Sequence, residues 1–73
     1  MYSVYVLKSL RDGKHYTGYS SDINRRLLEH NSGKTESTRL RRPFELIYSE
    51  QYQSEDEAKR RERFLRVERE EKN

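Results

Sequence analysis

The stretch YSVYVLKSLRDGKHYTGYS, residues 2–20, predicts a β-hairpin around which the rest of the chain is organised. Residues 2–7 are dense in β-branched and aromatic side chains, which strands favour. Asp12-Gly13 is a strong signal for a tight turn, and residues 15–19 then return as an antiparallel partner. Because residues 2–7 are largely apolar on both faces, we expect this first strand to be the central one.

Gly18 is an unusual residue in the second of these strands, where it lies between Thr17 and Tyr19. Glycine weakens a strand and usually marks a bulge, or a place where a ligand or another backbone comes close. Only 30% of the residues are hydrophobic, so the chain has little packing to spare. The position raises the question of what occupies the space beside Gly18.

The residues after the hairpin predict a helix and then a surface loop. In residues 20–33, Ser20 or Ser21 can cap the N-terminus of the helix, and Asp22 lies in its first turn, where the helix dipole favours a negative charge. Residues 34–43 lack periodicity and are rich in Ser, Thr and Arg. We therefore expect a loop over the surface there.

A third strand and a second helix complete the predicted fold. The segment FELIYSE, residues 44–50, is typical of a strand. Ser54 with Glu57 three residues later matches a capping box, so the second helix begins there, and we expect it to fray beyond Arg69. The residues expected on the inner faces of the two helices are Ile23, Leu27, Ala58, Phe64 and Leu65.

This order of elements, β-β-α-β-α, predicts an α+β fold with a small three-stranded antiparallel sheet flanked by helices. With 73 residues and no repeat or linker, residues 1–73 form at most one domain. A charged fraction of 40% leans toward disorder. The charges nearly cancel, however, to a net +3, and the apolar residues cluster in the strands, so we expect a small globular domain.

The chain contains no cysteine, which excludes a disulfide framework and any thiolate metal site. No apolar run is long enough to span a bilayer, and the first residues do not resemble a signal peptide. We therefore expect a cytoplasmic protein.

Two basic patches account for the pI of about 9.3: RLRR at residues 39–42 and KRRER at residues 59–63. Clustered Lys and Arg indicate a polyanionic partner, with nucleic acid the first candidate. For the second patch, a solvated helix face with interspersed Glu explains the charges equally well.

Candidate functional residues stand out by their type and predicted place. Two tyrosines lie on paired strands, and an arginine and a histidine four residues apart share one helix face. A glutamate lies at the edge of an apolar stripe, which is unusual unless it is paired or binds a metal. Taken singly, these are ordinary residues: core tyrosines, a solvated arginine, a histidine favoured by the helix dipole, and a glutamate paired with Arg66. The five are Tyr5, Tyr16, Arg26, His30 and Glu62.

Their spacing resembles the GIY-YIG nuclease family over nearly the whole chain. The segments SVY (residues 3–5) and YTG (residues 16–18) are similar to the two name motifs, with their tyrosines eleven positions apart. Arg26 falls eight residues after Gly18, His30 four further on, and Glu62 ends EAKRRE. The segments RRLLEHNSG and RRPFELIYSE resemble the small stand-alone bacterial members, in the excision-repair-nuclease-like branch. The chain departs from the family pattern at Ser3, at Thr17 and in having only Asn73 as an Asn downstream of the glutamate.

The resemblance implies a Mg²⁺ or Mn²⁺ ion held by Glu62 and an arginine, Arg26, on a phosphate oxygen. Tyr5 is the candidate for the general base, with Tyr16 and His30 orienting the water or sharing the proton transfer, and the assignment among the three stays open. Gly18 would leave the strand open beside the scissile phosphate. The predicted nucleic-acid contacts are Gly18, Arg25, Lys34, Arg39, Arg41 and Arg42.

The function that the resemblance implies is hydrolysis of phosphodiester bonds in DNA by a metal-dependent endonuclease, at branches, flaps or damage during repair or recombination. Nothing in the sequence looks like a base-reading element, so a protein partner or the shape of the DNA would supply specificity. The alternative is a non-catalytic nucleic-acid-binding module of the same fold.

Overall fold

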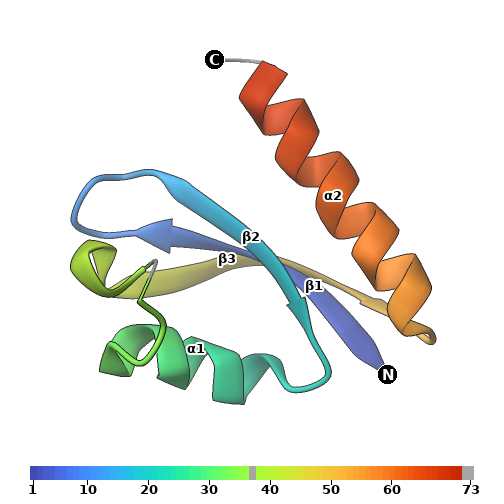
Figure 1. Ribbon diagram of the computed structural model, residues 1–73, viewed down its shortest axis with the longest axis horizontal. Helices are drawn as coiled ribbons and strands as arrows, with labels where there is room; N and C mark the ends of the chain where they lie inside the picture. Colours follow the sequence, from blue (N-terminus) through green and yellow to red (C-terminus); the bar gives the residue numbers. More distant parts are fainter. Residues whose placement is uncertain (37, 72–73) are drawn as a thin grey trace.

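The computed structural model describes the backbone of residues 1–36 and 38–71 and the side chains of this part up to residue 67. The described elements follow the predicted order β-β-α-β-α, which confirms the α+β fold (Figure 1). Their bounds are β1 Tyr2–Ser9, β2 His15–Ser20, α1 Ile23–Ser32, the 3₁₀ turn η1 Arg39–Arg41, β3 Phe44–Tyr52 and α2 Glu55–Glu71. The turn η1 lies inside the segment that we expected to be a loop.

The sheet has the strand order β2-β1-β3 and is antiparallel throughout, which confirms β1 as the central strand. In the β1–β2 hairpin, Tyr5 lies opposite Gly18 and Leu7 lies opposite Tyr16. Residues opposite one another point to the same face of a sheet. Tyr5, Gly18, Leu7 and Tyr16 therefore share one face.

The two helices cover opposite faces of this sheet (Figure 1). On one face, Tyr5, Leu7 and Phe44 form the buried core, and the partly buried Ile23 and Leu27 of α1 pack against it, as predicted.

On the other face, Val4 and Val6 are buried under α2, together with Ala58 of that helix. Contacts of α2 with the residues that flank Val4 across the sheet fix this placement: Tyr19 lies 3.5 Å from Glu55, and Glu50 pairs with Arg61 at 2.9 Å.

The helix caps correct one prediction and confirm two. Asp22, and neither Ser20 nor Ser21, is the N-cap of α1, and its carboxylate accepts a hydrogen bond from the backbone of Arg25 at 3.1 Å. The Ser20 hydroxyl lies just before the helix, where it accepts a hydrogen bond from the backbone amide of Asp22 at 3.0 Å. Gly33 ends α1 in the left-handed conformation, with φ of 86°, as the predicted stop requires. Ser54 caps α2 by accepting from the amide of Glu57.

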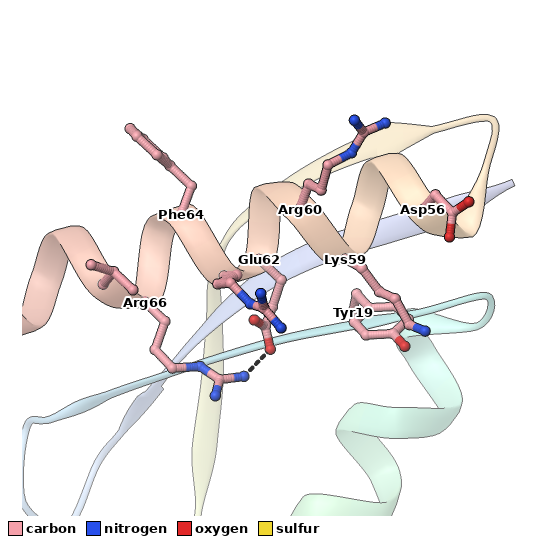
Figure 2. Close-up of a pocket in the computed structure, with 9 residues that line it drawn as sticks. Tyr19, Asp56, Lys59, Arg60, Glu62, Phe64 and Arg66 are labelled. Atoms are coloured by element: carbon pink, nitrogen blue, oxygen red, sulfur yellow. Dashed lines mark hydrogen bonds and ion pairs between the residues drawn. The ribbon is translucent and has the colours of Figure 1, made fainter.

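The prediction that Phe64 lies on the inner face of α2 is wrong. Its side chain is 56% exposed, whereas Ala58 is fully buried and Leu65 is partly buried. Phe64 is two residues after Glu62, and a helix turns about 200° over two residues. Since Glu62 points toward the sheet, Phe64 points away from it (Figure 2). The structure describes α2 up to Glu71, and residues 72–73 lie outside the described part, so the expected fraying beyond Arg69 stays a prediction.

Candidate active site

A buried chain of polar contacts runs from β1 through α1 to the loop before η1. The Tyr5 hydroxyl lies 3.5 Å from Nε2 of His30, and Nδ1 of the same ring lies 2.8 Å from the hydroxyl of Thr38. All three side chains are buried, His30 and Thr38 completely. Because the Thr38 hydroxyl can donate to the Thr35 carbonyl at 3.4 Å, it can accept from Nδ1. Nε2 is then left to accept from the hydroxyl of Tyr5.

Aromatic rings hold His30 in this position. The ring of Tyr16 meets it edge-on at a centroid distance of 4.9 Å, and Phe44 lies 5.9 Å away on another side. Tyr16 itself is half-buried, so it is the more accessible of the two candidate tyrosines. The ring of His30 is thus enclosed, and it reaches a substrate only through its neighbours.

Arg26 adds the positive charge of this cluster. Its guanidinium donates to Glu29 at 2.7 Å and interacts with the Tyr5 hydroxyl. Burial raises the pKa of Tyr5, and Arg26 opposes that rise. Burial also lowers the pKa of His30, and the charge of Arg26 lowers it further. At neutral pH the site therefore contains a protonated Tyr5, a neutral His30 and a cationic Arg26.

The space beside Gly18 is filled by the phenol of Tyr5. A Cβ at position 18 would lie 2.6 Å from the Tyr5 hydroxyl oxygen and 2.7 Å from Cζ of the same ring. Gly18 therefore admits the side chain of a neighbouring strand, and this accounts for a glycine inside β2. The predicted contact of Gly18 with nucleic acid stays a prediction.

Glu62 belongs to the other side of the sheet, on α2. The residue is only 8% exposed, and its carboxylate pairs with the guanidinium of Arg66. From the sequence, Arg66 is the partner that would give Glu62 a purely structural role. Its negative charge contributes to the raised pKa of Tyr5. Among the described side chains, the hydrogen-bond and ion-pair partner of Glu62 is Arg66 and not a member of the Tyr5 cluster.

The predicted nucleic-acid-binding residues differ in how much of their charge is engaged. Arg25 pairs with Glu29 at 3.3 Å, and Arg41 pairs with Asp12 at 3.1 Å. Arg42 lies across Gly33. Lys34 and Arg39 are exposed.

Three residues of the site region escaped the sequence-based prediction: Glu29, Thr38 and Thr17. Glu29 gave a usable signal, because it lies three residues after Arg26 and ion pairs form at that helical spacing. Thr38 gave none, since it lies in an aperiodic loop and only the fold brings it to His30. Thr17 is buried in β2, and its hydroxyl has no hydrogen-bond partner in the described part of the chain.

Comparison with known proteins identifies the family, since the GIY-YIG catalytic domain matches residues 1–73. The chain belongs to the GIY-YIG family. Members of this family are nucleases, they act on nucleic acids, and they generally use divalent metal ions.

The relatives of this GIY-YIG chain are small proteins of similar size. A UPF0213 protein of Staphylococcus epidermidis is 48% identical over 60 residues, which cover 81% of this chain and 72% of the relative. One from Staphylococcus saprophyticus is 42% identical over the same share of each chain. The solution structure of a UPF0213 protein of Bacillus halodurans superposes on this chain with a TM-score of 0.54 and 40% sequence identity. The match covers 92% of this chain and 72% of that protein.

Proposed function

We propose that this chain is a cytoplasmic, divalent-metal-dependent endonuclease that hydrolyses phosphodiester bonds in branched, flap or damaged DNA during repair or recombination. The observation that carries the proposal is the convergence of Tyr5, Tyr16, Arg26 and His30 at the β2 side of a domain that matches a nuclease family. A partner protein or the shape of the DNA supplies the specificity.

The donor groups fit a magnesium or manganese ion. Within the described residues there is no cluster of three or more acidic, histidine or cysteine ligands, and Glu62 offers a single shielded carboxylate. Mg²⁺ suits such a site because it keeps most of its waters and binds through one or two carboxylates plus substrate phosphate. The ion would supply Lewis acidity toward the phosphate and stabilise the leaving oxygen. Arg66, the present partner of Glu62, would have to give way to it.

Arg26 is proposed to bind a non-bridging phosphate oxygen. A guanidinium is permanently charged and planar, and it can hold a phosphate with two hydrogen bonds. The Arg26 side chain is 35% exposed, so it reaches solvent while Glu29 holds its position. The pair with Glu29 also keeps the guanidinium close to Tyr5.

Exposure favours Tyr16 over Tyr5 as the residue that takes a proton from the attacking water. Tyr5 is 1% exposed and its pKa is raised, so it is poorly suited to become an anion that meets water. Tyr16 is half-buried and stands against His30. In this proposal, Tyr5 and His30 hold Tyr16 and Arg26 in place, and Tyr16 is the general base.

An incision assay tests the proposal. The purified chain is incubated with single-stranded, duplex, flap and junction DNA in the presence of Mg²⁺, Mn²⁺ or a chelator. We expect nicking that depends on metal, is abolished by Arg26→Ala and by Glu62→Gln, and falls about 10²- to 10⁴-fold in Tyr16→Phe, the range typical of general acid–base catalysis.

Matched variants separate catalysis from charge and folding. Arg11→Ala removes the same charge as Arg26→Ala from an exposed position at the hairpin turn, and Glu45→Gln makes the same change as Glu62→Gln at an exposed position on β3. Both controls should cut as the wild type does. Salt-dependent DNA binding without cleavage under either metal would support the non-catalytic module instead. Cleavage by Arg26→Ala and Glu62→Gln at wild-type rates would refute the site.

A further inference from the structure

A row of cations runs along α2 beside Glu62. Lys59, Arg63 and Arg66 are spaced i, i+4 and i+7, which places them on one side of the helix. Together with Tyr19 of β2 they line a groove that also contains the carboxylate of Glu62 (Figure 2). Lys59 and Arg66 extend along the β2 side of α2, whereas Phe64 projects to the opposite side (Figure 2). We call Lys59, Arg63 and Arg66 the α2 stripe.

The α2 stripe offers two cations that are not engaged in a described ion pair, as does the basic patch at residues 39–42. Arg66 pairs with Glu62, but neither Lys59 nor Arg63 makes an ion pair with any side chain described up to residue 67. The groove also contains one exposed acid, Asp56, near the start of the helix. In the patch at residues 39–42, one cation is likewise paired, Arg41 with Asp12 at 3.1 Å. A polyanion therefore meets three closely spaced cations on α2, directly beside the proposed metal carboxylate.

We propose that the α2 stripe is a phosphate track, which binds the backbone of the DNA strand next to the bond that is cut. This inference rests on the proposed function, because it takes DNA as the substrate. Lys and Arg on a regular helical spacing match a repeating phosphate charge and carry no base-reading geometry. The stripe therefore binds without sequence preference, and its contribution falls steeply with salt.

Arg66 links the track to the metal site. It is the described partner of Glu62, and its side chain is 54% exposed, so its guanidinium can move from the carboxylate to a nearby phosphate. A dication at Glu62 would repel the guanidinium and favour that movement. The track is then complete only when Glu62 has another cation to neutralise it.

The salt dependence of DNA binding tests the track without any cleavage. Fluorescence anisotropy with labelled single-stranded and duplex oligonucleotides, in chelator and at several salt concentrations, gives the affinity and its salt slope. Each lost phosphate contact reduces the slope by about 0.7 for single strands and about 0.9 for duplex. For Lys59→Gln/Arg63→Gln we expect a slope lower by about 1.4 to 1.8 and a loss of affinity on the order of tenfold near physiological salt.

Arg11→Gln/Lys14→Gln is the control, because it removes the same charge from exposed positions at the hairpin turn. It should retain the wild-type slope. The track is refuted if the two double variants show the same decrease in salt slope, because net charge alone would then explain the effect. It is also refuted if Lys59→Gln/Arg63→Gln binds DNA as the wild type does, because the stripe would then serve another partner or only solvate α2.

A second measurement addresses Arg66. Isothermal titration of Mn²⁺ should give tighter binding to Arg66→Gln than to wild type, by a few-fold, since the competing guanidinium is gone; unchanged or weaker Mn²⁺ binding would contradict the link. Binding and cleavage then fail separately. If the protein cuts DNA but the salt slope of binding is unchanged in Lys59→Gln/Arg63→Gln, the proposed nuclease function stands and the phosphate track is refuted. If DNA binding depends on the α2 stripe but no cutting occurs with Mg²⁺ or Mn²⁺, the phosphate track stands and the proposed nuclease function is refuted.

Discussion

The two faces of the sheet differ in how completely the chain fills them. On the α1 face, Tyr5 occupies the space over Gly18, and both ring nitrogens of His30 lie close to hydroxyl groups. On the α2 face, the buried hydroxyl of Thr17 has no described partner, and Glu62 meets a single guanidinium from its own helix.

This difference separates a preorganised part of the site from an open part. The α1 face positions its residues without any ligand, because its members contact one another through hydrogen bonds and ring packing. The α2 face leaves carboxylate, hydroxyl and ammonium groups that a metal ion and a phosphate backbone would satisfy. Disturbing the first face should therefore cost stability, whereas disturbing the second should change binding and leave the fold intact.

Gly18→Ala should produce the largest loss of stability. A methyl group would lie 2.6 Å from the Tyr5 hydroxyl oxygen, and Tyr5 is too deeply buried to move aside freely. Overpacking of this kind typically costs about 1–3 kcal/mol. At a tolerant strand position, the same substitution would instead stabilise by about 0.5–1 kcal/mol. Denaturant unfolding followed by circular dichroism gives the sign directly.

A double-mutant cycle identifies Tyr5 as the cause. On a Tyr5→Leu background the obstructing hydroxyl is absent, so Gly18→Ala should cost less there than in the wild type. Additive effects of the two substitutions would mean that the alanine acts through the backbone of β2, and the explanation given for Gly18 would then fail.

The fold was largely predictable because its signals are local. Asp12-Gly13 predicts the hairpin, and the capping box at Ser54 marks the start of α2. The errors arose where neighbouring residues compete for one role. Ser20 and Ser21 were the expected caps of α1, with Asp22 in the first turn, and the backbone conformation makes Asp22 the cap instead. Phe64 was assigned to the inner face because it is apolar. In the structure Glu62 is buried toward the sheet, and Phe64, two residues later, therefore points to solvent.

The site was predictable only as a set of residue types. Helical spacing places Arg26 and His30 on one face, but it cannot show that Tyr5 fills the space over Gly18 or that Thr38 reaches His30 from a loop. The separation of Glu62 from the tyrosines also depends on which helix covers which face. That arrangement is a property of the packed sheet rather than of any motif.

The pH dependence of stability tests the burial of His30, with an intermediate effect. Its pKa is lowered in the folded state by burial and by Arg26, whereas an unfolded histidine titrates near 6.5. Below about pH 6.5 the unfolded chain takes up a proton that the folded chain does not, so stability is lost as the pH falls. We expect about 1 kcal/mol to be lost between pH 7 and 5.5 because of this residue.

His30→Gln should remove that part of the slope, although the variant is less stable at every pH. His15 is exposed at the start of β2, so His15→Gln is the matched control and should keep the wild-type slope. Unfolding free energies at four pH values settle the comparison. Equal slopes in His30→Gln and the wild type would place the ring in contact with water.

Thr17→Val probes the open face and should have the smallest effect, opposite in sign to the others. The Thr17 residue is 4% exposed and its hydroxyl has no described partner, so the folded state bears an uncompensated desolvation cost. Valine has the same shape without the hydroxyl, and we expect a gain of up to about 1 kcal/mol. A loss of stability would show that a bound water satisfies the hydroxyl. If the variant is more stable but binds Mn²⁺ more weakly, the Thr17 hydroxyl serves ligand binding at the expense of stability. The α2 face would then be a binding surface, whereas the α1 face is already satisfied by its own side chains.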